Sequence, residues 1–202
     1  MKVCEVFKSI QGEGRNQGKP CTFVRLAGCN LRCAWCDTLY AQEGGEEMTL
    51  REIFSRAVDL RGLLVCITGG EPLLQGKELL PLLALLYGHG FSIEIETNGT
   101  IDFRSFQEYA SICMDIKCPS SGETSDLALI PHLKPGDSLK FVVADYSDCA
   151  YAEQVIRAHP VPVEIFISPV YGSDYRIAAE FVLATDLPVR MQLQLHKVLG
   201  VA

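Results

Sequence analysis

The 202-residue chain lacks the long apolar runs that a membrane span requires. Its most apolar stretch, residues 79–86, is too short to cross a bilayer, and residues 1–8 contain no apolar signal region. Serine-, glycine- or proline-rich tracts, long runs of charge and low-complexity segments are also missing, so nothing suggests a linker. We therefore expect a single cytoplasmic domain over residues 1–202 that buries one sizeable core and has no membrane partner.

Positive charge is scarce. The chain has 18 Lys and Arg residues against 25 Asp and Glu residues, which gives a formal net charge of −7. A surface that follows nucleic-acid phosphates needs an excess of positive charge. We therefore expect a small-molecule substrate and no nucleic-acid partner.

A second Cys-x-x-Cys pair is absent, although the chain has nine cysteines. Cys29, Cys33 and Cys36 have three residues in the first gap and two in the second. A structural zinc site would want four protein ligands, usually as two separated pairs. Three thiolates in one loop instead suit an iron-sulfur cluster, and they leave its fourth corner without a local protein ligand.

The remaining cysteines are expected to be core or incidental thiols. The odd number of cysteines, the short thiol cluster and the missing signal region favour a reducing compartment over a disulfide-bonded secreted domain. These thiols are Cys4, Cys21, Cys66, Cys113, Cys118 and Cys149.

Apolar, β-rich runs alternate with helical patterns, which is typical of βα units and a mainly parallel sheet. The expected strands are 22–26, 63–68, 92–96, 112–116, 138–143 and 163–167. The expected helices are 49–60, 77–88, 103–109, 150–158 and 174–184, the first opening with a capping box of Thr49 and Glu52. Six such units predict an α/β fold, an open partial (β/α)6 barrel.

Polar and glycine-rich segments follow these strands. They are the cysteine loop and residues 69–72, 97–99, 117–119 and 168–169. In a parallel α/β sheet, loops at the carboxyl ends of strands share one rim, where ligands bind. The Gly69-Gly70 pair suits either close approach of a ligand or a tight turn before a helix.

The three-cysteine pattern, followed by Gly69-Gly70-Glu71-Pro72, resembles the radical S-adenosylmethionine superfamily. That resemblance implies a 4Fe-4S cluster held by Cys29, Cys33 and Cys36, whose fourth iron chelates the amine and carboxylate of S-adenosylmethionine. It also implies the open partial barrel as the shared fold. It implies cofactor contacts at Trp35, Cys36, Asp37, Gly70 and Glu71.

Further motifs narrow the resemblance over the whole chain. They are Gln11-Gly12-Glu13-Gly14, Arg25, Cys36-Asp37-Thr38, Glu96-Thr97-Asn98-Gly99 and the tail from His196 to Ala202. Together they resemble the 7-carboxy-7-deazaguanine synthase family. The amide of Gln11 and the carboxylate of Glu13 match the donor and acceptor edge of a pterin, and Arg25 could grip a carboxylate. A glycine turn and a strand-edge ion pair are the alternatives for these residues.

The family resemblance implies further site residues. Substrate contacts would fall on Ile10, Gln11, Gly12, Glu13, Arg25, Thr97, His196 and the terminal carboxylate of Ala202. Further cofactor contacts would fall on Gly99, Asp115, Ile116 and Lys117, although many members carry Ser-Pro-Lys where this chain has Asp-Ile-Lys. Thr38 would ligate Mg²⁺ beside the substrate carboxylate, whereas on sequence alone a threonine here would more often be a local cap.

The implied activity is that of a carbon-nitrogen lyase. It contracts 6-carboxy-5,6,7,8-tetrahydropterin to 7-carboxy-7-deazaguanine with loss of ammonia, on the route to queuosine and other 7-deazapurines. A low-potential flavodoxin or ferredoxin would deliver the electron, and the family is typically homodimeric. The alternatives are a glycyl-radical-activating enzyme, which shares the cysteines but not Gln11, Glu13 and Arg25, and a non-catalytic metal-binding module.

Overall fold

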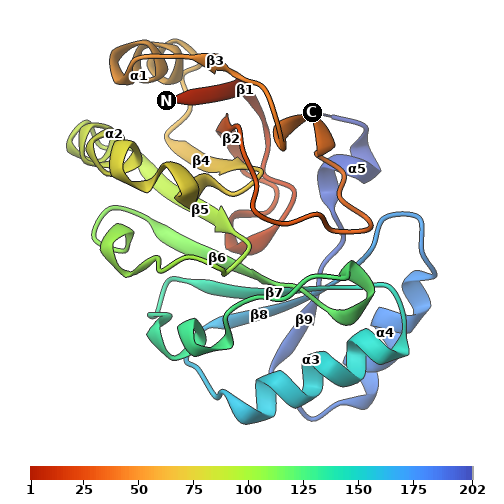
Figure 1. Ribbon diagram of the computed structural model, residues 1–202. Helices are drawn as coiled ribbons and strands as arrows, with labels where there is room; N and C mark the ends of the chain where they lie inside the picture. The colour runs from red at the N-terminus through yellow and green to blue at the C-terminus, as the bar shows by residue number, and fades with distance from the viewer. Residues whose placement is uncertain (202) are drawn as a thin grey trace.

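The computed structural model describes residues 1–201, and Figure 1 shows one curved sheet with α1 to α4 outside it. The sheet has nine strands in the order β3-β1-β2-β4-β5-β6-β7-β8-β9 and is open. Its parallel strands are β2 (Pro20–Leu26), β4 (Leu64–Gly69), β5 (Ser92–Thr97), β6 (Ser111–Ile116), β7 (Ser138–Val143) and β8 (Glu164–Pro169). All six predicted strands are therefore confirmed, as is the open α/β class.

Three further strands were not expected. β1 (Lys2–Ile10) pairs antiparallel with β2, and the short β3 (Glu46–Glu47) pairs antiparallel with β1. At the other edge, β9 (Val189–Met191) extends the parallel set beside β8. The sequence of β1 mixes charged and apolar residues, and only its pairing with β2 over most of its length makes it a strand.

Four helices cover the outer face of the sheet. They are α1 (Leu50–Asp59), α2 (Gly76–Gly88), α3 (Tyr146–Ala158) and α4 (Tyr175–Ala184), and a short α5 (Leu195–Leu199) follows near the carboxyl end. The predicted capping box of α1 is present, because Thr49 accepts from the Glu52 amide and the Glu52 carboxylate accepts from the Thr49 amide. Among the helices described over residues 1–201, none has both the length and the apolar character needed to cross a membrane.

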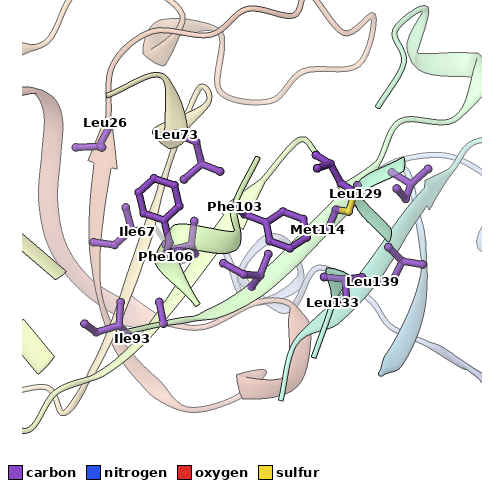
Figure 2. Close-up of a cluster of buried hydrophobic side chains, with 14 of the residues drawn as sticks. Leu26, Ile67, Leu73, Ile93, Phe103, Phe106, Met114, Leu129, Leu133 and Leu139 are labelled. Atoms are coloured by element: carbon purple, nitrogen blue, oxygen red, sulfur yellow. The ribbon is translucent and has the colours of Figure 1, made fainter. Parts of the chain in front are cut away.

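The prediction of a helix over 103–109 is wrong. Only a 3-10 turn, Arg104–Phe106, forms there, and Phe103 and Phe106 are both buried. Figure 2 shows the two rings packed beside Leu73 and Met114. A 3-10 turn places residues three positions apart on one side, which suits the burial of both Phe103 and Phe106.

The two faces of the parallel strands differ in polarity. On the outer face Ile67, Ile95 and Phe141 are fully buried in the main core cluster. At the alternate positions the strands carry polar side chains that line a cavity, among them Arg25, Thr68, Glu96, Asp115 and Lys140. Strands of a parallel sheet are ordinarily apolar on both faces. The polar inner face therefore marks the inside of the curved sheet as a site rather than a second core.

Candidate active site

A cavity of about 750 Å³ lies inside the curved sheet. Its wall includes side chains from β1, β2 and β4 to β7, together with the cysteine loop and the segment that contains α5. The segments that follow the strands meet around it, as the parallel arrangement requires: the wall includes Cys29, Gly70, Asn98, Lys117 and Val170.

The cysteine loop has a defined backbone path. The Gly28 amide donates to the carbonyl of Ala41 at 2.8 Å, and the Ala34 amide donates to the carbonyl of Ser121 at 2.9 Å. In this loop Cys29, Cys33 and Cys36 are half-buried, and all three line the cavity. The sequence therefore wraps three thiols around one part of the wall.

The spacing of these thiols can be compared with that of a single-ion site. Among residues 1–201, the only group of three or more His, Cys, Asp or Glu ligand atoms within 4.8 Å of one another is Cys66, Glu94 and Glu96. At least one pair of sulfurs in the cysteine loop is therefore farther apart than that. A single zinc ion would bring its thiolates within about 4 Å of one another, whereas each thiolate of an iron-sulfur cluster binds a separate iron. The three thiols fit a cluster better than a single ion.

The other six cysteines lie apart from this loop. All nine cysteines are free, and five of the six, all but the half-buried Cys4, are buried. Burial raises the pKa of the Cys66, Cys113 and Cys118 thiols. A neutral buried thiol behaves as a small apolar group, which agrees with the expected core role. Cys113 differs from the others because it lines the cavity.

Trp35, Asp115 and Lys117 form a contiguous part of the wall, which we call the tryptophan group. The Lys117 ammonium lies 2.6 Å from Asp115 Oδ2 and 5.6 Å from the centre of the Trp35 ring. The Trp35 indole donates to Ser120 Oγ at 3.0 Å, which fixes the plane of the ring. A flat aromatic face beside a carboxylate suits a nucleoside-like ligand.

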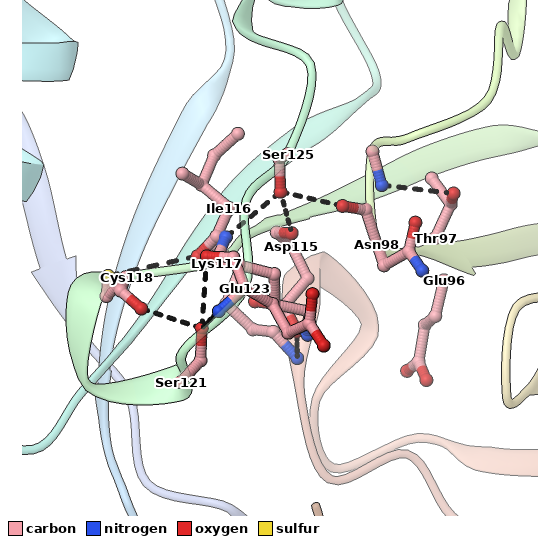
Figure 3. Close-up of polar contacts among 12 residues, drawn as sticks. Glu96, Thr97, Asn98, Asp115, Ile116, Lys117, Cys118, Ser121, Glu123 and Ser125 are labelled. Atoms are coloured by element: carbon pink, nitrogen blue, oxygen red, sulfur yellow. Dashed lines mark hydrogen bonds and ion pairs between the residues drawn. The ribbon is translucent and has the colours of Figure 1, made fainter. Parts of the chain in front are cut away.

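Ser125 links this group to the neighbouring strand β5, as Figure 3 shows. Its hydroxyl accepts from the Lys117 amide at 3.0 Å and donates to the carbonyl of Asn98 at 2.7 Å. The ends of β5 and β6 are thereby tied together.

A second part of the wall, which we call the glutamate group, consists of Glu13, Gln194 and His196. Glu13 is 6% exposed and forms an ion pair with Lys140, while Gln194 Nε2 donates to its other oxygen at 2.6 Å. Burial opposes ionisation, but Lys140, Gln194 and His196 together outweigh it and hold the pKa of Glu13 below its ordinary value. Burial lowers the pKa of His196, which favours the neutral ring.

Arg25 reaches the cavity from β2. Its Nε donates to Glu5 at 2.7 Å, and its guanidinium lies over the rings of Phe7 and Tyr40. The strand-edge ion pair considered as an alternative is therefore present. Among the hydrogen bonds of residues 1–201, none uses the two terminal nitrogens of Arg25, which remain able to bind a carboxylate in a fork.

The carboxyl-terminal segment packs over this part of the cavity. The Leu195 amide donates to the carbonyl of Gly12 at 3.1 Å, and Lys197 forms an ion pair with Asp37 at 2.9 Å. The segment thus connects the amino-terminal loop with the cysteine loop (Figure 1).

Comparison with known proteins identifies the family. Residues 24–117 match the Radical SAM superfamily. A Methanospirillum hungatei protein named 7-carboxy-7-deazaguanine synthase is 52% identical over 200 residues, which cover 99% of this chain and 86% of the relative. One of the same name from Koribacter versatilis is 38% identical, with 98% and 96% covered. The chain belongs to the 7-carboxy-7-deazaguanine synthase family.

The fold agrees with that family. The crystal structure of QueE from Escherichia coli matches with a TM-score of 0.74 at 27% identity, and the match covers 95% of this chain and 93% of that one. Streptococcus suis SuiB bound to its precursor peptide SuiA matches with a TM-score of 0.63 at 16% identity, over 84% of this chain and 48% of that one, and shows the shared fold alone. Membership in the Radical SAM superfamily implies a 4Fe-4S cluster and S-adenosylmethionine.

Most of the site residues expected from the family resemblance line the cavity. They are Ile10, Gln11, Glu13, Arg25, Cys29, Cys33, Trp35, Cys36, Asp37, Thr38, Gly70, Thr97, Asp115, Lys117 and His196. Thr38 donates to Asp37 Oδ1 at 2.8 Å and makes no capping bond to the turn it begins. The local-cap alternative for Thr38 is therefore not what the structure shows. Ala202 lies outside the described residues.

Four expected contact residues of the family motifs do not line the cavity. Ile116 is fully buried in the outer core, and Gly99 has a φ of +69° in the turn after β5. Gly12 lies under His196, so close that a β-carbon there would be 1.9 Å from His196 Nδ1. The fourth is Glu71.

Glu71 stands behind the wall and holds it in place. Its carboxylate is fully buried and accepts from Thr97 Oγ1 at 2.9 Å and from the amides of Leu73 and Asn98. The glycine before it is needed for packing, because a β-carbon at Gly70 would lie 2.3 Å from the carbonyl oxygen of Gly28. In this family member, the Gly-Gly-Glu turn therefore joins β4 to the start of the cysteine loop.

The amide of Gln11 is also occupied. Its Nε2 donates to Glu94 at 2.7 Å and to Glu96 at 3.1 Å, and its Oε1 accepts from the Glu13 amide. Both donor hydrogens of this amide are thus used within the protein, and its contact with a pterin edge stays a prediction. Burial and then Glu96 raise the pKa of Glu94 to about 7.

Several residues of the wall were missed from the sequence. They are Thr68, Glu96, Lys140, Tyr171, Gln194 and Lys197. A signal was present for the strand residues, since Glu96 and Lys140 alternate with apolar residues in runs that otherwise look like buried strands. Gln194 lies in a tail of alternating apolar and polar residues, whereas no comparable pattern pointed to Tyr171.

Proposed function

We propose that the protein is a 7-carboxy-7-deazaguanine synthase. It converts 6-carboxy-5,6,7,8-tetrahydropterin to 7-carboxy-7-deazaguanine with release of ammonia, within queuosine or 7-deazapurine biosynthesis. The observation that carries the proposal is one cavity lined by a three-cysteine loop, by an aromatic and carboxylate wall, and by a guanidinium with free terminal nitrogens. The chain is also up to 52% identical to proteins of that name. A glycyl-radical-activating enzyme would share the cysteine loop and the cofactor wall but would not require the guanidinium, and a metal-binding module would require neither the wall nor the guanidinium.

The chain's own groups hold and orient the reactants. When bound, a 4Fe-4S cluster and S-adenosylmethionine supply a carbon-centred radical that abstracts hydrogen from the substrate. Cys29, Cys33 and Cys36 hold the cluster. Trp35, the backbone of Cys36 and Asp37, Gly70, Asp115 and Lys117 bind the cofactor.

The substrate meets the remaining part of the wall. Arg25 grips its carboxylate through the free nitrogens, and Glu13 accepts from the N–H groups of its aminopyrimidinone ring. Further contacts come from Ile10, Gln11, Thr97, His196 and Ala202. Gly12 contributes by making room for His196. Because Glu71, Gly99 and Ile116 stand behind the wall, they contribute by placing Thr97 and Lys117.

We further propose that Thr38 ligates Mg²⁺ beside the substrate carboxylate. Magnesium favours few protein oxygens together with substrate oxygens and water, so a single hydroxyl is sufficient. The remaining proposals concern the cellular setting: a single domain over residues 1–202, a cytoplasmic homodimer, and a flavodoxin or ferredoxin as electron donor.

Anaerobic turnover tests the activity. The protein with a reconstituted cluster is mixed with the carboxylated tetrahydropterin, S-adenosylmethionine, Mg²⁺ and a chemical reductant, and product is detected by mass spectrometry. We expect 7-carboxy-7-deazaguanine from the wild type and none from Cys29→Ala, Cys33→Ala or Cys36→Ala, each of which should lose iron. Cys149→Ala is the control for loss of a thiol. Cofactor cleavage without this product would contradict the proposed substrate.

Thr38→Ala tests the magnesium site. We expect iron content and cofactor cleavage to be kept while activation by Mg²⁺ weakens about tenfold, since one oxygen ligand is lost. The measurement is turnover against Mg²⁺ concentration, and Thr38→Ser, which keeps the hydroxyl, is the matched control. Identical Mg²⁺ curves for Thr38→Ala and the wild type would show that the ion binds elsewhere.

A further inference from the structure

Lys140 is a buried lysine in the middle of β7. It is 6% exposed, in a strand whose six residues are all buried. Its Nζ forms an ion pair with Glu13 and lies 3.9 Å from Asp115 Oδ2. Burial would lower the pKa of Lys140, but Asp115 and Glu13 outweigh it and raise the pKa well above its ordinary value. The ammonium therefore stays charged, as a buried lysine can only when it is paired.

The two partners of Lys140 belong to the two groups of the cavity wall. Asp115 is part of the tryptophan group, where Lys117 lies 2.6 Å away. Glu13 is part of the glutamate group, where Gln194 donates to it at 2.6 Å. Among residues 1–201, Lys140 alone forms ion pairs with both carboxylates. The strand register favours this position, because Asp115 and Lys140 are direct neighbours in the β6–β7 pairing.

Asp115 also has an unmet acceptor. Its Oδ1 is buried and has no hydrogen-bond partner among the described residues, although the residue lines the cavity. A buried acceptor without a donor is unfavourable, so a ligand hydroxyl or N–H in the cavity would gain by donating to it. Such a donor would also compete with Lys117 and Lys140 for the carboxylate of Asp115.

We propose that Lys140 is a positioning residue that couples the two groups, so that a ligand bound at the tryptophan group raises the affinity of the glutamate group for a pterin. The identity of the ligands rests on the proposed function. When a cofactor hydroxyl donates to Asp115, the Lys140 ammonium is left to Glu13. Glu13 is then fixed where it accepts from the pterin N–H groups. Because binding free energies are reciprocal, the pterin raises the affinity for the cofactor by the same factor.

The test measures binding without turnover. The dissociation constant of 6-carboxypterin, a fluorescent oxidised form of the proposed substrate, is measured on the cluster-containing protein by anaerobic equilibrium dialysis without reductant. Each variant is measured with and without saturating S-adenosylmethionine. The ratio of the two constants is the coupling factor.

For the wild type we expect a coupling factor of about five or more, the lower end of typical couplings. In Lys140→Met it should fall below about two, because the charge shared by the two carboxylates is gone. Lys140→Arg, which keeps a charge, should restore it. Lys134→Met is the matched control, since it removes the same charge from an exposed loop and should keep the wild-type factor.

A Lys140→Met protein with full iron content and the wild-type factor would overturn the proposal, as would a wild type that binds the pterin equally with and without the cofactor. If Lys140→Met fails to fold, Asp115→Asn decides, because it keeps the shape of Asp115 and removes its charge. A wild-type coupling factor in Asp115→Asn would also overturn the proposal. A wild type that binds no pterin in either condition contradicts the proposed function itself, and the coupling with it.

Discussion

At the scale of single residues, the inner face of the sheet holds an unusual concentration of buried charge. Glu94 and Glu96 on β5 share the amide of Gln11, and Thr68 Oγ1 donates to Glu96 at 2.9 Å. Burial and the neighbouring charge of Glu96 both oppose the ionisation of Glu94. The protonation of Glu94 therefore contributes to the stability of the fold.

Glu94 gives the chain a pH-dependent stability. Its pKa of about 7 in the folded protein exceeds the ordinary value of 4.5, so the native state binds more protons between these values. The free energy of unfolding that this group contributes is complete below the lower value and is lost as the pH rises through the higher one. Glu94→Gln cannot titrate, so relative to the wild type it should gain about 1 kcal/mol between pH 6 and pH 8.

Anaerobic urea unfolding of the cluster-containing proteins at the two pH values measures this difference. Any constant cost of the substitution cancels between them. Glu108→Gln removes one exposed carboxylate from the surface and serves as the control. The same stability difference between Glu94→Gln and the wild type at both pH values would contradict the assignment.

Gly12 makes room for His196. A β-carbon there would lie 1.9 Å from His196 Nδ1, so Gly12→Ala must displace the ring. We expect the KM for the pterin to rise about tenfold, equivalent to about 1.4 kcal/mol of binding, while iron content is unchanged. Gly88→Ala is the matched control, because nothing lies within 4 Å of a β-carbon at that position. An unchanged KM in Gly12→Ala would show that the position of His196 does not matter to the substrate.

At the scale of elements, the local sequence pattern was sufficient to predict the strands that are buried along most of their length. The six parallel strands and the capping box of α1 were predictable because apolar runs and capping residues are local signals. β1 was missed because it becomes a strand only by pairing with β2. α5 was missed because a helix of five residues is too short to show a periodic apolar pattern. The rim was predictable from the parallel order of the strands. The contacts of Gln11 and Glu71 were not, because they depend on residues more than 20 positions away.

The segment leading to α5 is held by the side chain of Gln192, which bonds to both backbone groups of Gly14. Gln192 accepts from the Gly14 amide at 2.7 Å and donates to the Gly14 carbonyl at 2.9 Å, and it is 6% exposed. Gln192→Ala should lower the free energy of unfolding by about 2 kcal/mol, because two buried backbone groups lose their partners. It should also raise the KM for the pterin, since Gln194 and His196 follow directly.

Urea unfolding and steady-state kinetics measure the two effects. Gln154→Ala, at an exposed position of α3, is the matched control and should change neither. A Gln192→Ala protein that is destabilised but keeps its KM would mean that the segment supports the fold without shaping the cavity.

At the scale of the whole molecule, the open sheet divides two tasks between its faces. The outer face is a continuous apolar core under the helices (Figures 1 and 2). The inner face is a polar cavity. Strand residues alternate between the faces, so adjacent positions on one strand should have separable effects. The division predicts that stability and catalysis can be changed independently along the same strand.

Ile67 and Thr68 on β4 test this division. Ile67 is fully buried in the outer core, so Ile67→Ala should lower the free energy of unfolding by about 3 kcal/mol and leave kcat and KM within about twofold. Thr68 donates to Glu96 in the cavity, so Thr68→Val, which keeps the shape, should cost about 1 kcal/mol of stability yet lower kcat/KM about tenfold. Unfolding and turnover are measured on both variants under the same anaerobic conditions. If both variants lost stability and kcat/KM in the same proportion, the two faces would not be independent, and the cavity would depend on the outer core for its shape.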